Sequence, residues 1–170
     1  MELSHFLFEA AGIGAFAILL LTEAWRRRWY WAALLLSGAV FGMFLEIGNI
    51  AMAGTYHYSR DFIFAAGGVP LAIGLGWAAI MYSVMRLNDR YAVSLPGKLV
   101  LDGLGVLLID LAIDAVAIRL GFWQWLIGPR QEWFGVPFEN LIAWIGVGVS
   151  FAVVMRLLAK YQKRNFFYYA

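Results

Sequence analysis

Residues 99–118 read LVLDGLGVLLIDLAIDAVAI, an apolar run of membrane-spanning length that contains three acids, Asp102, Asp110 and Asp114. Asp110 and Asp114 are four residues apart, so on a helix they lie on the same face. An ionisable side chain inside a membrane costs roughly 2.5–3.5 kcal/mol even on the most lenient insertion scale. The pair therefore indicates either interhelical hydrogen bonds that hold a bundle together, or a buried site in which a neutral carboxyl donates a proton.

The composition is that of an integral membrane protein. Of the 170 residues, 63% are hydrophobic, whereas soluble domains contain about 45–50% apolar residues. There is no cysteine, which excludes disulfides and thiol chemistry. The basic residues are few and lie at the ends of apolar runs, so we predict no nucleic-acid partner. The length fits a single transmembrane domain, residues 1–170.

Five apolar runs are each long enough to cross the roughly 20 residues of a bilayer core. They predict an all-α fold, a polytopic integral membrane helical bundle of about five transmembrane helices. The expected location is the cell membrane (plasma or inner), crossed several times, with the lipid bilayer as a partner. The predicted spans are residues 4–25, 31–53, 69–87, 98–118 and 138–159.

The distribution of lysine and arginine predicts the orientation of the bundle. Ten of these residues lie between the first and second spans, between the third and fourth spans, and after the fifth, and three lie on the other side. Since positive charges favour the cytoplasmic side, we predict that the N-terminus is outside and the C-terminus is cytoplasmic. Loops 54–68 and 119–137 then face outside.

With this orientation, acids from four helices reach the same depth, in the outer half of the membrane. Because carboxylates that face lipid are hard to tolerate, we expect these acids to converge on the interior of the bundle: Glu9, Glu46, Asp114 and Glu139. Glu46 shares a helix face with Asn49. Glu139, in the first turn after Pro137, equally suits an acid that complements a helix dipole. Glu9 and Asp102 suit interfacial or structural roles.

Aromatic residues gather in the two loops predicted to face outside and in the nearby spans. Tyr56 and Tyr58 flank His57, and the tryptophans of this region are Trp77, Trp123, Trp125 and Trp144. An interfacial aromatic belt explains them, and so does a pocket for a hydrophobic polyene whose cationic intermediates the ring faces would stabilise. With only two histidines and no cysteine, we predict no metal site.

Small residues recur inside the predicted spans, where they allow helices to approach closely. We expect this role for Gly12, Gly14, Gly42, Gly48, Gly74, Gly76, Gly103, Gly105, Gly146 and Gly148. No internal repeat of 20–50 residues is apparent.

Several short motifs follow one another in a recognisable order. In the first half they are EIG at 46–48, GTYHYS at 54–59, GVPL at 68–71 and Trp77; in the second half they are DLAID at 110–114, GFWQW at 121–125, FGVP at 134–137, Asn140 and Trp144. Together they resemble the carotenoid-biosynthesis membrane protein family, whose members include carotenoid 1,2-hydratases of the bisanhydrobacterioruberin hydratase type. The family typically has proline after the second aspartate, where this chain has Ala115.

The resemblance implies a cofactor-free hydro-lyase that adds water to the terminal C1=C2 double bond of a linear carotenoid or other isoprenoid. A carboxylic acid would protonate C2, and water oriented by a second carboxylate would attack the tertiary cation at C1. We expect Asp114 to donate the proton, with Asp110 and Glu46 tuning it or orienting water. The residues expected to line the substrate are Tyr56, Tyr58, Trp123, Trp125, Asn140 and Trp144.

Two other functions also fit the sequence. One is a non-catalytic membrane subunit that binds a carotenoid or another pigment, as a homo-oligomer or within a larger membrane complex. The other is a small proton-coupled transporter that uses Asp110 and Asp114 as a relay. Inverted repeats, which would favour transport, are not apparent.

Overall fold

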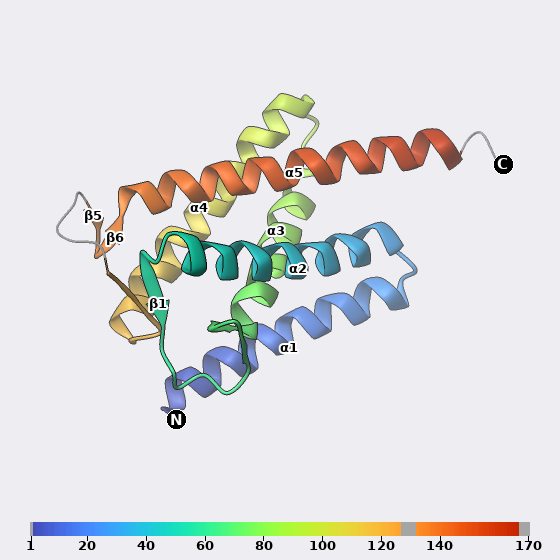
Figure 1. Cartoon of the computed structure of the whole chain (residues 1–170). Coiled ribbons are helices and arrows are strands. Elements are labelled where there is room, and N and C mark those ends of the chain that lie inside the picture. The colour runs from blue at the N-terminus through green and yellow to red at the C-terminus, as the bar shows by residue number, and fades with distance from the viewer. Residues whose placement is uncertain (1, 127–131, 167–170) are drawn as a thin grey trace.

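The computed structural model describes residues 2–126 and 132–166, with side chains described as far as residue 160. Five described helices form one bundle (Figure 1): α1 (Leu3–Trp25), α2 (Trp29–Met52), α3 (Leu71–Asn88), α4 (Leu95–Arg119) and α5 (Phe138–Phe166). Four described segments are long and apolar enough to cross a membrane: α1, α2, α3 and the Phe138–Lys160 part of α5. The remaining helix, α4, is also long, with 25 residues, but its apolar run contains aspartates. The prediction of a helical membrane bundle is confirmed.

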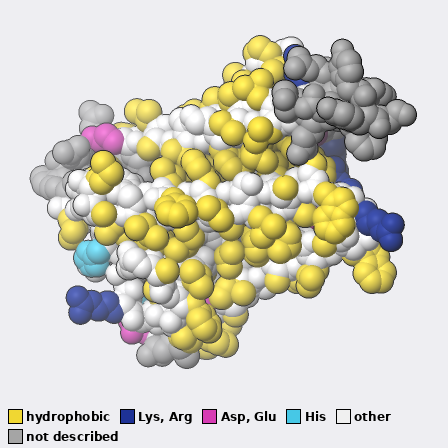
Figure 2. Space-filling view, turned by 45° about the vertical axis from the view of Figure 1, so that its right-hand side comes forward, with side chains coloured by type: hydrophobic (Ala, Val, Ile, Leu, Met, Phe, Trp, Pro, Cys, Tyr) yellow, Lys and Arg dark blue, Asp and Glu magenta, His cyan; other side chains and the backbone are white. Residues whose placement is uncertain are grey.

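The surface of the bundle suits contact with lipid tails. Figure 2 shows one face, on which hydrophobic side chains cover the middle and charged side chains lie towards the two ends. Large apolar side chains such as Ile18, Leu21 and Phe44 are exposed on the helices. Exposing these side chains to water would cost free energy, whereas contact with lipid tails carries no such cost.

In the part of the chain that the structure describes, three antiparallel strand pairs cap one end of the bundle, which we call the strand end (Figure 1). The pairs are β1 (Tyr56–Tyr58) with β4 (Trp123–Trp125), β2 (Ala65–Ala66) with β3 (Val69–Pro70), and β5 (Glu132–Trp133) with β6 (Val136–Pro137). The opposite end, which we call the basic end, holds the α1–α2 and α3–α4 connections. Arg26, Arg27 and Arg28 form the first connection, and Lys98 lies in the first turn of α4, just after the second.

The chain after α1 is built from two equivalent halves. The order α2, β1, β2, β3, α3 is followed by α4, β4, β5, β6, α5. Equivalent positions are 67 residues apart: Pro70 and Pro137 each precede a helix, and Trp77 and Trp144 each lie seven residues further on. The hairpins β2–β3 and β5–β6 both turn through two residues of positive φ, the type I′ geometry that matches strand twist. The repeat unit is longer than the 20–50 residues of the common repeat families.

The two halves meet about an approximate two-fold axis that runs along the bundle. Across this axis the equivalent strands β1 and β4 pair, with His57 opposite Gln124. The equivalent rings of Trp77 and Trp144 stack with centroids 4.0 Å apart and planes 6° apart. In each half the two helices pack closely against each other, α2 on α3 and α4 on α5. Helix α1 has no counterpart among the described helices and packs mainly on α3.

The glycines expected at close helix contacts divide into two groups. A Cβ atom on Gly42 would lie 2.6 Å from the Trp77 side chain, and one on Gly103 would lie 2.7 Å from Val149, so these glycines do permit close packing. The expectation is wrong for four others, where an added Cβ would meet nothing within 4 Å: Gly14, Gly48, Gly76 and Gly146.

Buried charges at the basic end are paired. The fully buried Asp102 carboxylate accepts hydrogen bonds from Arg156 Nε (2.9 Å) and from Asn88 Nδ2 (2.9 Å), which join α3, α4 and α5. Glu23 of α1 accepts from Arg28 (2.5 Å) and from the Tyr82 hydroxyl (2.6 Å). Asp102 and Glu23 therefore act as structural links between helices.

The orientation remains a prediction that single cysteines can test, because the chain has no cysteine of its own. His57 is exposed at the strand end and Val93 is exposed at the basic end. We expect His57→Cys to react with a membrane-impermeant maleimide in intact cells, and Val93→Cys to react only after the membrane is opened. The opposite labelling pattern would show that the bundle is inverted.

Removing Arg156 should destabilise the bundle, because Asp102 would be left as a buried charge without its cation. Breaking a buried ion pair in this way costs about 3–5 kcal/mol. We therefore expect Arg156→Met to lower the thermal unfolding midpoint in detergent markedly. The double variant Asp102→Asn/Arg156→Met, which removes both charges, should recover most of the loss, and a double variant as unstable as the single one would contradict the ion-pair explanation.

Candidate functional site

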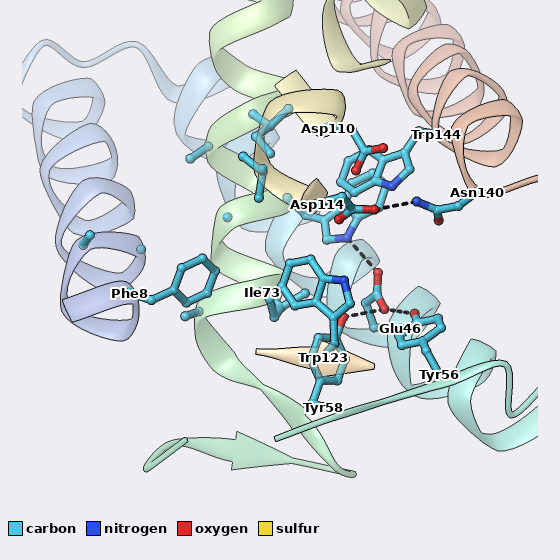
Figure 3. A pocket seen from close by; sticks show the side chains of 18 of the residues that line it. Phe8, Glu46, Tyr56, Tyr58, Ile73, Asp110, Asp114, Trp123, Asn140 and Trp144 are labelled. Atoms are coloured by element: carbon cyan, nitrogen blue, oxygen red, sulfur yellow. Dashed lines mark hydrogen bonds between the residues drawn. The ribbon is translucent and has the colours of Figure 1, made fainter. Parts of the chain in front are cut away.

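A cavity of about 280 Å³ lies within the strand-end half of the bundle, where α1, α3 and α4 meet the β1–β4 pair. Figure 3 shows its polar side chains turned towards one another on one side and Phe8 of α1 facing them across the space. The residues that carry polar atoms into its lining are Glu46, Tyr56, Tyr58, Trp77, Asp110, Asp114, Trp123, Trp125, Asn140 and Trp144. The rest of the lining is apolar, so a hydrophobic ligand would meet three carboxyl groups at one side of this cavity.

Glu46 of α2 is the most strongly hydrogen-bonded of these carboxyl groups. Its Oε1 accepts from Trp77 Nε1 at 3.0 Å, and its Oε2 accepts from the hydroxyls of Tyr58 (2.8 Å) and Tyr56. Asn49, one turn along α2, donates to the Tyr56 oxygen. Three donors on one buried carboxyl group suit the carboxylate form, because an ionised carboxylate only accepts hydrogen bonds.

The β1–β4 pair places the two tyrosines. Because side chains alternate across a strand, Tyr56 and Tyr58 are buried towards the cavity while His57 between them is exposed. Their partners are aromatic: Tyr56 lies opposite Trp125 and Tyr58 lies opposite Trp123. The ring centroids of these pairs are 4.9 Å and 5.8 Å apart, so the aromatic layer fixes the hydroxyls in front of Glu46.

Asp110 and Asp114 of α4 both line the cavity, one helical turn apart. Asp114 Oδ2 accepts from Asn140 Nδ2 of α5 at 2.7 Å. Asp110 is 1% exposed; no described N–H or O–H group donates to its carboxyl oxygens, and the side chain with which it shares a hydrogen bond is the Asp114 carboxyl group one turn away. A buried carboxyl group that receives no hydrogen bond from a donor costs free energy, and an intramembrane acid of this kind is the usual mark of a functional site.

A second cavity, of about 500 Å³, lies between α2 and α5 on the other side of the stacked tryptophans. It is the counterpart of the first cavity under the internal repeat, because α2 and α5 correspond to α4 and α3. Both cavities are lined by Glu46, Tyr56, Trp77, Asn140 and Trp144. Asp110 and Asp114 line only the first, and Asn49 lines only the second.

Most of the side chains singled out in the sequence meet at the first cavity. All three expected acids line it, and so do all six residues expected to contact the substrate: Tyr56, Tyr58, Trp123, Trp125, Asn140 and Trp144. His57 points away from the cavity. Among the described residues, no group of three or more histidines, cysteines or acids is placed to hold a metal ion.

The expectation that four acids converge on the bundle interior is wrong for Glu139, and Glu9 lies in the interior but takes the structural role also predicted for it. Glu9 is buried, but its oxygens accept from the backbone N–H groups of Ile63 and Phe64, both at 2.9 Å. It therefore ties the 59–70 loop to α1. Glu139 lies in the first turn of α5, is exposed and does not line the cavity. Its position fits the alternative role of complementing the helix dipole.

Two contributors were missed. Trp77 is absent from the residues expected to form the site, although an aromatic belt and a pocket both suit it, and its indole N–H is one of the three donors to Glu46. The repeat could have revealed it, since Trp77 and Trp144 follow Gly-Val-Pro at the same distance. Helix α1 was assigned no part in the site, yet Phe8, Ala11 and Ala15 form one wall of the cavity; nothing in their sequence distinguishes them from lipid-facing residues.

The two buried tyrosines should keep their protons at high pH. Burial, and after it the Glu46 carboxylate, raise the pKa of the Tyr58 hydroxyl well above its usual range, and the same causes raise the pKa of Tyr56. Ordinary tyrosines ionise near pH 10, so above that pH the folded state would retain protons that the unfolded chain loses, and the stability due to these groups would decline as the pH rises.

In a titration followed at the absorbance of ionised tyrosine, we therefore expect Tyr56→Phe/Tyr58→Phe and the unaltered protein to show the same change up to about pH 11. If the absorbance change near pH 10 were smaller in the double variant than in the unaltered protein, by the amount due to two ionising tyrosines, the placement of both hydroxyls against Glu46 would be contradicted.

Comparison with known proteins adds one result to this geometry. A family model described as carotenoid biosynthesis protein matches residues 5–167. No curated protein matches the chain, and neither does any solved structure.

Proposed function

The chain belongs to the carotenoid biosynthesis protein family, and from that premise we propose that it adds water to the terminal C1=C2 double bond of a linear carotenoid. One observation carries the proposal: three carboxyl groups lie at one side of a largely apolar cavity, and one of them, Asp110, receives no hydrogen bond from a described donor and pairs with the neighbouring Asp114 carboxyl group. A substrate with a long apolar chain and a reactive end group fits such a cavity, because the chain would contact the apolar lining and the end group would meet the carboxyl groups.

The reaction requires one carboxyl group that gives a proton and others that face the resulting cation. The sequence favoured Asp114 as the donor. The hydrogen bonds favour its neighbour, because Asn140 donates to Asp114, whereas no described group donates to Asp110. As a neutral carboxylic acid, Asp110 can donate its own O–H to the Asp114 carboxylate in the resting state and to a substrate in the cavity that both residues line. We therefore assign the acidic proton to Asp110, with Asp114 as the second member of the pair.

The proposed steps balance without a redox partner. The Asp110 proton forms a new C–H bond at C2 with the electron pair of the double bond, which leaves a tertiary cation at C1. A water oxygen then forms the C1–O bond. The proton that this water loses passes to Asp114, one turn away, so the pair regains the proton that it gave up. The net change is the addition of one water molecule.

Glu46 would stabilise the cation rather than protonate the substrate. Its two oxygens already accept from Tyr56, Tyr58 and Trp77, so it is held as a fixed negative charge. The faces of Trp77, Trp123 and Trp144 line the same cavity, and aromatic faces attract cations. A preorganised anion and aromatic rings at the position where charge develops lower the barrier more than they would in water.

Cells that accumulate lycopene provide the test. After expression of the unaltered protein, we expect a pigment heavier by one water in the mass spectrum of the extract. Removing the proton donor should cost at least 100-fold in product, as general acids contribute roughly 10²–10⁴-fold. We therefore expect Asp110→Asn and Asp114→Asn both to lose the product, and Glu46→Gln to reduce it.

Glu9→Gln is the matched control, because Glu9 is an equally buried acid that does not line the cavity; its product yield per folded protein should stay near that of the unaltered chain. Product retained in both aspartate variants would rule out the proposed acid. Unaltered lycopene bound to the purified protein would instead assign it the role of a pigment-binding subunit.

A further inference from the structure

The first cavity extends beyond its carboxyl groups as an apolar groove. Helix α3 forms its floor, and α1 and α4 form its two walls. Gly76 lies on this floor, and a Cβ atom added there would meet nothing within 4 Å. At the edge of the same cavity α1 and α3 are tightly packed: a Cβ on Gly12 would lie 3.2 Å from that of Ala72. Gly76 therefore leaves space for a ligand where Gly12 leaves space for a helix.

The groove reaches the surface of the bundle between α1 and α4. Ala11 and Ala15 of α1 and Ile113 of α4 line the cavity and are also exposed. Their height along the bundle is that of the membrane-spanning segments, so this opening faces lipid and not water. The residues at its edge are small or purely apolar, as a passage for an extended hydrocarbon requires.

The repeat provides a comparison within the same chain. In the second cavity the position equivalent to Gly76 is Ala143, 67 residues further on. No described helix covers the second cavity as α1 covers the first, and the aspartate pair does not line it. Only the first cavity thus joins an apolar groove to the two acids.

We propose that the polyene chain of the substrate passes from the lipid between α1 and α4 and lies across Gly76, with its terminal double bond at Asp110 and Asp114. The inference rests on the proposed function and adds the path of the substrate and a residue that sets its specificity. A carotenoid is dissolved in the bilayer, so a lateral opening lets it reach the acids without crossing water. Because residue 76 is a glycine, no side chain narrows the groove at this point.

Three leucine substitutions test this path in lycopene-accumulating cells, with product and co-purified pigment both measured per folded protein. Gly76→Leu fills the groove, and we expect at least a tenfold loss of both product and bound lycopene. Gly14→Leu is the matched control, because Gly14 is also a helical glycine with open space beside it and lines neither cavity; it should stay within twofold of the unaltered protein. Ala143→Leu fills the second cavity instead and should retain the bound lycopene.

A graded series separates blockage from misfolding. Gly76→Ala should cost less than Gly76→Val, and Gly76→Val less than Gly76→Leu, while the unfolding midpoint in detergent changes little, because the added atoms meet no protein atoms at Cβ. Equal product and pigment in Gly76→Leu and Gly14→Leu would overturn the path. Loss of pigment in Ala143→Leu but not in Gly76→Leu would move the substrate to the second cavity. An unaltered protein that neither binds nor converts lycopene would overturn the proposed function itself.

Discussion

The hydrogen bonds accepted by Glu46 determine how the strand end of the bundle is assembled. A carboxyl group buried among membrane helices is tolerated only when donors surround it, and here the donors come from different elements. Tyr56 and Tyr58 come from β1 and Trp77 from α3. To supply them, β1 must fold back over the end of α2, and this in turn fixes the position of β4, which pairs with it. The strand β4 directly follows α4, so the same constraint sets the height of Asp114 beside Glu46.

The repeat explains why the aromatic centre is nearly symmetric while the chemistry is not. Trp77 stacks on Trp144, and the tyrosines of β1 face the tryptophans of β4, position for position. The polar groups break the symmetry: Glu46 corresponds to Ile113, and Asn140 corresponds to Ile73. The duplicated scaffold therefore supplies a rigid aromatic frame on an axis. Differences between the halves place Asp110 and Asp114 on one side of this frame, where α1 covers the cavity.

Sequence reasoning located the helices and most of the polar side chains, but not the direction in which each side chain points. Apolar runs with turns between them are enough to define membrane helices. These helices are apolar on all faces, so no hydrophobic stripe identifies the interior side. For this reason the sequence predicts that Glu9 and Glu139 converge with Glu46, although Glu139 is exposed and neither of them lines the cavity. The hydrogen bond between Trp77 and Glu46 could not be predicted from the sequence either. It joins two helices whose relative rotation depends on close packing at glycines such as Gly42.

The buried acids of this bundle follow one rule with one exception. Asp102 and Glu23 each have an arginine, Glu9 has two backbone N–H groups, Glu46 has three side-chain donors, and Asp114 has an amide. These partners hold helices and loops together, and they offset the cost of burial. Asp110 is as deeply buried as Asp102, yet none of the described groups donates to it. Stability alone would favour an apolar residue at this position, because a second buried carboxyl group next to Asp114, with no described donor, weakens the bundle. Its location at the wall of the first cavity, where the acid pair meets an apolar groove, gives a reason for that cost: the carboxyl group remains available to a ligand.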